Sequence, residues 1–433
     1  MRLIAKLLSP VLVVVVAQMA LISRGIPLPV KHIDTPGRAV NILLPGLLGY
    51  GEDVALERLV PYFGGLTGLD FGRELEKRGF ETYQADIGPV SGAWDRACEL
   101  YAQLMGARVD YGLAHSEKYG HERYGRTYEK PLFEGWGPGR PLNLIGHSFG
   151  ANTARMFALL CDEGDAAERG ATPKAELSPL FAGGMIDRVH SITALAGPHN
   201  GSTASVCVPK DCDEKNYLWF MRIVGFMGSS GFVNGIYDLQ LDHFGMSRPP
   251  SWGLLPGQTP RLGGWIGSGY RKAARAFLRS MDHSFYDLSP DGAADFNKID
   301  KIRPSVYYFS YSSVITKPHG DSQLPRIREI MDPFLFGFAA QMGRGTGYIA
   351  LPDESWKVND GCVPLPSALY PAGQPHRDFT PGKTEVRPGV WNVMPTLPDA
   401  DHAYWCGGDP LHNGADEVFG IYLALMERLE GTY

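Results

Sequence analysis

The chain has 433 residues, of which 44% are hydrophobic and 20% are charged, as in a globular protein with a large core. Its formal net charge is −6 and it contains no run of lysine and arginine, so we expect no nucleic-acid partner. The 53 glycines and 33 prolines indicate long, shaped loops between the regular elements.

The first 23 residues differ from the rest. Arg2 and Lys6 accompany an apolar run at 7–22, which is typical of a signal peptide and short for a membrane span. No Ala-x-Ala cleavage site follows it, so an uncleaved signal anchor remains the alternative. In either case we expect the remaining chain to be exported from the cytosol.

Strand-like and helix-like segments alternate along the remaining chain. Strands are predicted at 40–44, 82–87, 142–145, 190–195 and 306–311, and a helix at 71–78. This alternation predicts an α/β fold with a mainly parallel sheet covered by helices on both faces. We expect a single domain over residues 36–433.

Residues 146–150 read Gly-His-Ser-Phe-Gly, between an apolar strand-like run and a helix-like run. A Gly-x-Ser-x-Gly turn in that setting is the nucleophile elbow of α/β hydrolases, and it makes Ser148 the candidate nucleophile.

Such a serine needs a base and an acid, which follow it in the order acid, then base. Asp360, in an Asn-Asp-Gly turn, is our candidate acid, and His402, in a loop near the C-terminus, is our candidate base. The competing residues are Asp399 and Asp401 for the acid, and His376 and His412 for the base. Two backbone N–H groups should form the oxyanion hole, from Phe149 after the nucleophile and from Leu47 after the first strand.

A second cluster of polar residues precedes the elbow. His115 and His121 lie six residues apart in a segment of low apolar content, and Asp95 lies nearby in the sequence. Two imidazoles and a carboxylate could bind one metal ion, although two solvated loop histidines are the plainer interpretation.

Further segments make the chain similar to the zinc-containing thermoalkalophilic bacterial triacylglycerol lipases. These segments recur in order over about residues 40–410. They are Trp-Asp-Arg-Ala-Cys-Glu at 94–99, Asp-Tyr-Gly at 110–112, Gly-Arg-Thr-Tyr at 125–128, Leu-Ser-Pro-Leu-Phe at 177–181, Pro-His-Asn-Gly at 198–201, Tyr-Asp-Leu-Ser at 286–289 and Gly-Val-Trp-Asn at 389–392.

The resemblance implies the triad Ser148, Asp360 and His402. It also implies a zinc ion bound by Asp95, His115, His121 and Asp242. Four protein ligands leave no open position, so such an ion is structural. It would tie an insertion at about 90–128 to the segment that follows a lid.

The lid is expected within a cap at about 205–285, because residues 205–237 are rich in apolar side chains and the family carries a helical lid there that opens at a lipid–water interface.

Two departures from the family concern the site. The chain has Pro45-Gly46-Leu47 where the family has His-Gly-Phe, and Phe149 where it has Gln. The family's calcium site has an acidic residue where this chain has Tyr404, so we do not expect calcium beside Asp409.

Six cysteines suit an exported protein but do not define a pairing. The spacing suggests bridges between Cys207 and Cys212 and between Cys362 and Cys406, and buried thiols at Cys98 and Cys161.

Taken together, the sequence predicts a lipase acting on acylglycerol esters. The alternatives are a short-chain carboxylesterase or an acyltransferase with the same triad, or an inactive hydrolase-fold binding protein.

Overall fold

The computed structural model describes residues 38–51, 57, 60–204, 238–246, 273, 276–325, 333–346, 350–408 and 415–433. The expected signal segment at 1–23 and the lid residues 205–237, with Cys207 and Cys212, lie outside these ranges. No helix among the described residues is long and apolar enough to cross a membrane.

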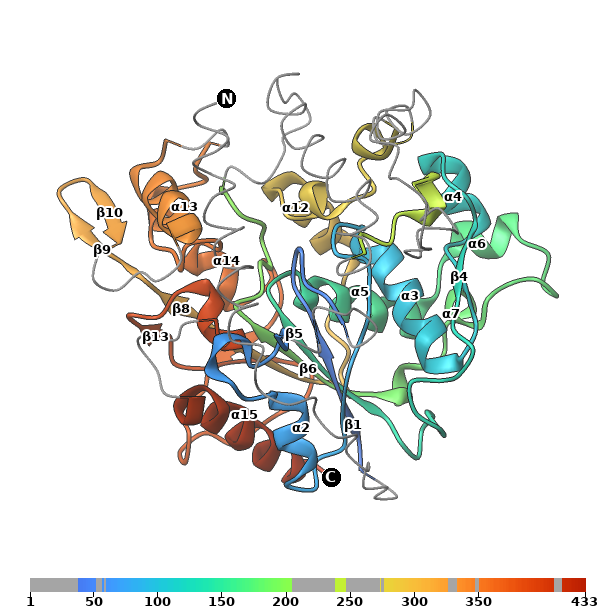
Figure 1. Ribbon diagram of the computed structural model, residues 1–433, viewed down its shortest axis with the longest axis horizontal. Coiled ribbons are helices and arrows are strands. Elements are labelled where there is room, and N and C mark those ends of the chain that lie inside the picture. Colours follow the sequence, from blue (N-terminus) through green and yellow to red (C-terminus); the bar gives the residue numbers. More distant parts are fainter. Residues whose placement is uncertain are drawn as a thin grey trace, which may run out of the picture.

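The centre of the protein is a seven-stranded sheet in the order β11-β12-β7-β6-β5-β1-β2, and every neighbouring pair is parallel (Figure 1). Its strands are β1 (Val40–Leu44), β2 (Thr82–Gln84), β5 (Leu142–His147), β6 (Val189–Leu195), β7 (Tyr307–Tyr311), β11 (His376–Asp378) and β12 (Trp391–Val393). The predicted α/β fold with a parallel sheet is therefore confirmed, although β2 ends three residues before the predicted strand.

Three two-stranded ribbons flank this sheet. They pair β3 (Arg108–Asp110) with β4 (Tyr124–Thr127), β8 (Ser313–Val314) with β13 (Leu397–Pro398), and β9 (Thr316–His319) with β10 (Ser322–Pro325).

The described α-helices lie between and around the strands. They are α2 (Phe71–Glu76), α3 (Ala93–Met105), α4 (Leu113–Tyr119), α5 (Phe149–Glu163), α6 (Ala166–Ala171), α7 (Pro179–Ala182), α11 (Ser284–Asp287), α12 (Pro290–Ile299), α13 (Pro333–Arg344), α14 (Leu365–Leu369) and α15 (Ala415–Glu430). Short 3₁₀ helices are η1 (Gly65–Thr67), η2 (Ile186–Arg188), η3 (Asp242–Phe244), η5 (Glu354–Lys357) and η6 (His402–Cys406).

Helices cover both faces of the sheet because its buried strands are apolar on both sides. In β1, Val40, Ile42 and Leu44 pack in the same core as residues of α3 and α5. Leu43 points to the other core, which contains residues of α2 and α15. The two cores hold the strand ends in place, and the loops that follow the neighbouring strands β1 and β5 meet where Gly46 approaches Ser148.

Candidate active site and metal cluster

Ser148 occupies a strained turn between β5 and α5. Its φ is 54°, in the left-handed region that side chains rarely adopt. The turn requires glycine on both sides: a Cβ on Gly146 would lie 2.3 Å from the Gly150 carbonyl carbon, and one on Gly150 would lie 2.2 Å from Leu44 O. The strain and the two close approaches are those of a nucleophile elbow.

Asp360 and His402 form a buried pair. His402 Nδ1 lies 2.8 Å from Asp360 Oδ2, and the carboxylate is fully buried. The other oxygen, Oδ1, accepts the N–H groups of Cys362 at 2.9 Å and Val363 at 2.7 Å. Because Nδ1 donates to the carboxylate, Nε2 of His402 is left as the proton acceptor that a general base requires.

The described alternatives are occupied elsewhere. Asp401 caps η6 by accepting the N–H groups of Ala403 and Tyr404, and Asp399 pairs with Lys317. The exposed His376 stacks on Tyr370. His412 lies outside the described residues.

His147 connects the base to the loop after β1. Its Nε2 lies 3.0 Å from His402 O, and its Nδ1 lies 2.7 Å from the Tyr62 hydroxyl, which accepts the Gly46 N–H at 3.0 Å. Burial, with a smaller contribution from His402, lowers the pKa of His147 to about 3. The ring is therefore neutral, and its Nε2–H must donate to the His402 carbonyl.

Both expected oxyanion donors lie at this junction. Gly46 approaches the nucleophile so closely that an added Cβ would lie 2.8 Å from Ser148 Cβ. Leu47 follows it, and its N–H makes no hydrogen bond to any of the described residues. Phe149 begins α5, where the N–H has no partner within the helix.

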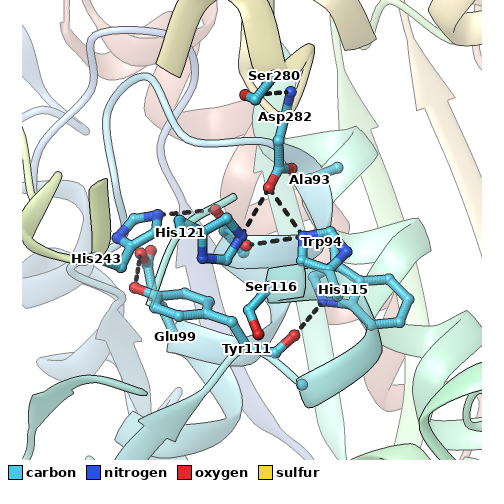
Figure 2. Close-up of polar contacts among 12 residues, drawn as sticks. Ala93, Trp94, Glu99, Tyr111, His115, Ser116, His121, His243, Ser280 and Asp282 are labelled. Carbon is cyan, nitrogen blue, oxygen red and sulfur yellow. Dashed lines mark hydrogen bonds and ion pairs between the residues drawn. The ribbon is translucent and has the colours of Figure 1, made fainter. Parts of the chain in front are cut away.

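A second buried cluster lies beside α3 (Figure 2). It contains Asp95 of α3, His115 of α4, His121 after α4 and Asp282 before α11, and one ligand atom from each lies within 4.8 Å of the others. His115 Nε2 lies 2.9 Å from Asp282 Oδ2 and 3.4 Å from Asp95 Oδ1, and His121 Nε2 lies 3.1 Å from Asp282 Oδ2.

The contacts around these side chains fit a cation. His121 Nδ1 lies 2.9 Å from Glu122 O, so Nδ1–H donates to the carbonyl and Nε2 is the ring nitrogen that faces the cluster. Oδ1 of the buried Asp95 accepts no hydrogen bond from the described residues, although His115 Nε2 lies 3.4 Å from it. Two carboxylates and two imidazoles whose ligand atoms lie this close together are a set that Zn²⁺ accepts.

The same proximity shifts the pKa values. Burial lowers the pKa of His115, but Asp282 and Asp95 together raise it to about 10. Burial raises the pKa of Asp282, yet the imidazoles of His115 and His121 more than offset this effect and lower it. The carboxylates and the imidazoles of the cluster therefore favour each other's charged forms.

The structure brings three of the four expected ligands, Asp95, His115 and His121, together. The fourth, Asp242, lies with its Oδ2 3.0 Å from Arg126 Nη2. Asp282 is the residue that completes the group of four side chains in the structure. Asp242 is nevertheless next to His243, whose Nε2 lies 3.0 Å from the second oxygen of Asp95, so the expected segment reaches the cluster through its neighbour.

Sequence reasoning also missed Tyr62 and His243, which act through other residues and carry no motif of their own. Of the thiols, Cys98 and Cys161 are buried and free, as expected. Cys406 is a free thiol 3.3 Å from Ala403 O, so the expected bridge to Cys362 is not formed.

A parallel sheet, a serine at positive φ between strand and helix, and a buried carboxylate–imidazole pair together are features of the α/β-hydrolase class. Within it, the chain belongs to the family described as "Lipase-like, C-terminal domain", whose family model matches residues 38–429.

Named relatives agree with this family. The chain is 34% identical over 417 residues to Lipase 2 of Staphylococcus aureus, covering 94% of this chain and 56% of the relative. It thus spans about half the length of the curated relatives it matches. Staphylococcus hyicus lipase superposes with a TM-score of 0.80 at 30% identity, covering 93% of this chain and 99% of that one. EstA from Clostridium botulinum gives a TM-score of 0.74 at 30% identity, with 93% and 92% covered.

Proposed function

We propose that this protein is a serine ester hydrolase of the lipase type, acting on acylglycerol esters. The observation that supports the proposal is the buried Asp360–His402 pair, in which the backbone carbonyl of His402 is hydrogen-bonded to His147, the residue before the strained Ser148. The lipases among its relatives support the choice of substrate class.

In this mechanism His402 Nε2 takes the proton of Ser148 Oγ as that oxygen attacks the ester carbonyl carbon. The N–H groups of Leu47 and Phe149 donate to the oxyanion that forms. The alcohol leaves with the proton from His402, and an acyl-enzyme remains. A water molecule that gives its proton to His402 then releases the fatty acid.

Asp360 has an orienting and electrostatic part in this cycle. Its Oδ1 is already occupied by two backbone N–H groups, so only Oδ2 can face the imidazole. The ring is thereby kept in one tautomer and one orientation, and the imidazolium that forms is stabilised by a carboxylate fixed in place.

A fluorophosphonate probe that labels active serines tests the proposal. We expect the wild type to be labelled and to hydrolyse esters, and Ser148→Ala to do neither. Ester hydrolysis that survives in Ser148→Ala, or a wild type that is neither labelled nor active, would contradict it; the latter result would favour an inactive binding protein.

The substrate class needs a separate experiment. Rates on soluble short-chain esters and on emulsified long-chain glycerides are compared in the same preparation. A lipase turns over the emulsion, whereas activity confined to soluble esters indicates a carboxylesterase. Ester formation on an added alcohol indicates an acyltransferase.

We further propose that Asp95, His115, His121 and Asp282 hold a structural Zn²⁺. When bound, the ion supplies a crosslink between α3, the segment around α4 and the chain before α11. With four protein ligands it has no open position for substrate. We also propose that an apolar lid within 205–285 opens at a lipid–water interface, and that the protein is exported from the cytosol. Both proposals rest on the sequence, because the segments concerned lie mostly outside the described residues.

A further inference from the structure

Arg96 is a buried cation that reaches from α3 to the loop after β1. Its side chain is fully buried. Nη1 donates to Gly46 O at 3.2 Å, Nη2 donates to Pro45 O, and the guanidinium carbon lies 4.9 Å from the centre of the Phe149 ring. The same group therefore contacts both segments that carry an expected oxyanion donor.

Burying a cation is costly unless hydrogen bonds satisfy it. Here the two successive backbone carbonyls of Pro45 and Gly46 accept from its two terminal nitrogens, and a third carbonyl, Gly88 O, lies 3.4 Å from Nη1. The guanidinium is a rigid planar fork, so it holds the two carbonyls of Pro45 and Gly46 in one relative orientation. A lysine ammonium has no such fork.

The orientation of Gly46 O decides the orientation of the Leu47 N–H. The two groups belong to one planar trans peptide unit and point in opposite directions. A donor that holds the oxygen on the Arg96 side therefore turns the N–H away from Arg96. A positive group at the oxygen also polarises the peptide and makes its N–H a stronger donor.

The other end of Gly46 is held as well. Its N–H donates to the Tyr62 hydroxyl, and its Cα faces Ser148 so closely that no side chain fits between them. Gly49 N–H gives Gly46 O a second donor at 3.1 Å. Gly46 O is thus occupied, whereas the Leu47 N–H of the same peptide has no partner among the described residues.

We propose that Arg96 is a positioning residue for ester hydrolysis. It orients and polarises the Leu47 N–H of the oxyanion hole, and its guanidinium packs on the ring of Phe149. This inference rests on the proposed function, since it assigns a role within the same site. Arg96 touches no reacting atom and acts through the Gly46–Leu47 peptide. Its contribution is preorganisation of a donor aimed at charge that develops in the transition state.

The test compares wild type, Arg96→Met and Arg96→Lys on a soluble ester. Removing one oxyanion donor outright costs about 10²–10³ in kcat. Misorienting one should cost less, so we expect kcat for Arg96→Met to fall roughly 10- to 100-fold. Inhibition by a boronic acid, which forms a tetrahedral anion on the serine, should weaken by a similar factor, while binding of an uncharged ether analogue of the ester stays unchanged.

A general loss of packing would not separate these two ligands. Arg303→Lys provides the matched control, because Arg303 is buried and paired with Asp300 outside the site. We expect it to lower the melting temperature without changing the ratio of boronate to ether affinity. Arg96→Lys keeps the charge and the fold but offers no fork, so an intermediate kcat and ratio are expected.

The possible outcomes distinguish failure of the proposed function from failure of the proposed role of Arg96. A wild type that neither labels with fluorophosphonate nor hydrolyses the ester refutes the proposed function itself. A wild type that does both, with a folded Arg96→Met or Arg96→Lys that keeps its kcat and its boronate affinity, refutes the role of Arg96 alone. If Arg96→Met does not fold, Arg96→Lys decides the question.

Discussion

The proposed triad pair, Asp360 and His402, and the proposed metal cluster use the same two residue types in opposite ways. In the triad pair, one oxygen of Asp360 accepts two backbone N–H groups and the other accepts the His402 Nδ1–H, so both oxygens have donors within the protein. In the cluster, Oδ1 of Asp95 accepts no hydrogen bond from the part of the chain that the structure describes, and Asp282 Oδ2 faces two imidazoles. A satisfied carboxylate holds a base for proton transfer, whereas an unsatisfied one suits a cation.

The largest effect should come from breaking the satisfied pair. In Asp360→Asn the amide can donate to His402 Nδ1, which moves the ring proton to Nε2 and removes the base. We expect kcat to fall ~10⁴-fold with the fold intact, as measured by ester hydrolysis and circular dichroism. Asp399→Asn, at an exposed ion pair with Lys317, should keep wild-type activity. Equal activity in the two variants would contradict the assignment of the acid.

Removing a ligand should act on stability before chemistry. We expect about one zinc per chain in the wild type and in Asp242→Asn, and loss of zinc in Asp282→Asn, measured by elemental analysis. At free zinc ~1,000-fold above Kd, binding adds ~4 kcal/mol to the free energy of unfolding, and a chelator should remove that contribution. Zinc lost from Asp242→Asn and kept in Asp282→Asn would restore the sequence-based ligand set.

A smaller effect, on metal affinity, is expected from the contact at the second oxygen of Asp95. His243 is hydrogen-bonded to this oxygen, much as backbone N–H groups are to one oxygen of Asp360. Outer-shell partners of this kind change metal affinity by ~10–100-fold. His243→Ala should therefore release zinc to a competing chelator at a lower chelator concentration, and His243→Gln, which keeps a donor, should release it later than His243→Ala. Wild-type affinity in both variants would show that Asp95 needs no such support.

The smallest effect is on the pH dependence of stability, and it concerns His190, whose pKa is shifted by burial. Burial lowers the pKa of His190 to about 4, whereas the carboxylates raise that of His115. The unfolded chain binds a proton at His190 near pH 6.5 and the folded chain does not, so this site contributes stability above that pH and loses it as the pH falls towards 4. We expect His190→Gln to lose less melting temperature than wild type between pH 6.5 and 4.5. A parallel decline in both proteins would contradict this.

Local patterns in the sequence predicted the sheet and the elbow well. The strand at 40–44 coincides with β1, because its four apolar residues are buried whichever helices cover them, and the buried Asn41 finds hydrogen-bond partners within the protein. The elbow is likewise a local structure, since its glycines are required by contacts within five residues and with the adjacent strand. Asp360 and His402 followed from the order of residues that this class of sheet imposes.

The fourth residue of the metal cluster could not be predicted from local patterns in the sequence. Asp242 and Asp282 are both aspartates that are followed directly by a histidine, so the residue type and the next residue do not separate them. The difference arises because Arg126 occupies the carboxylate of Asp242, while the chain before α11 brings Asp282 against His115. Such a choice depends on contacts between residues more than a hundred positions apart.

The sequence alone thus determined the α/β architecture, the strained Ser148 and the residue types of both clusters, because each depends on short-range sterics or on burial patterns along one segment. Only the tertiary structure decided that Asp282 joins the metal cluster, that Cys406 stays a thiol, and that Arg96 lies under the Gly46–Leu47 peptide. The reason is physical: hydrogen bonds and ion pairs act over about 3 Å, and the packing of helices on the sheet decides which distant groups come that close.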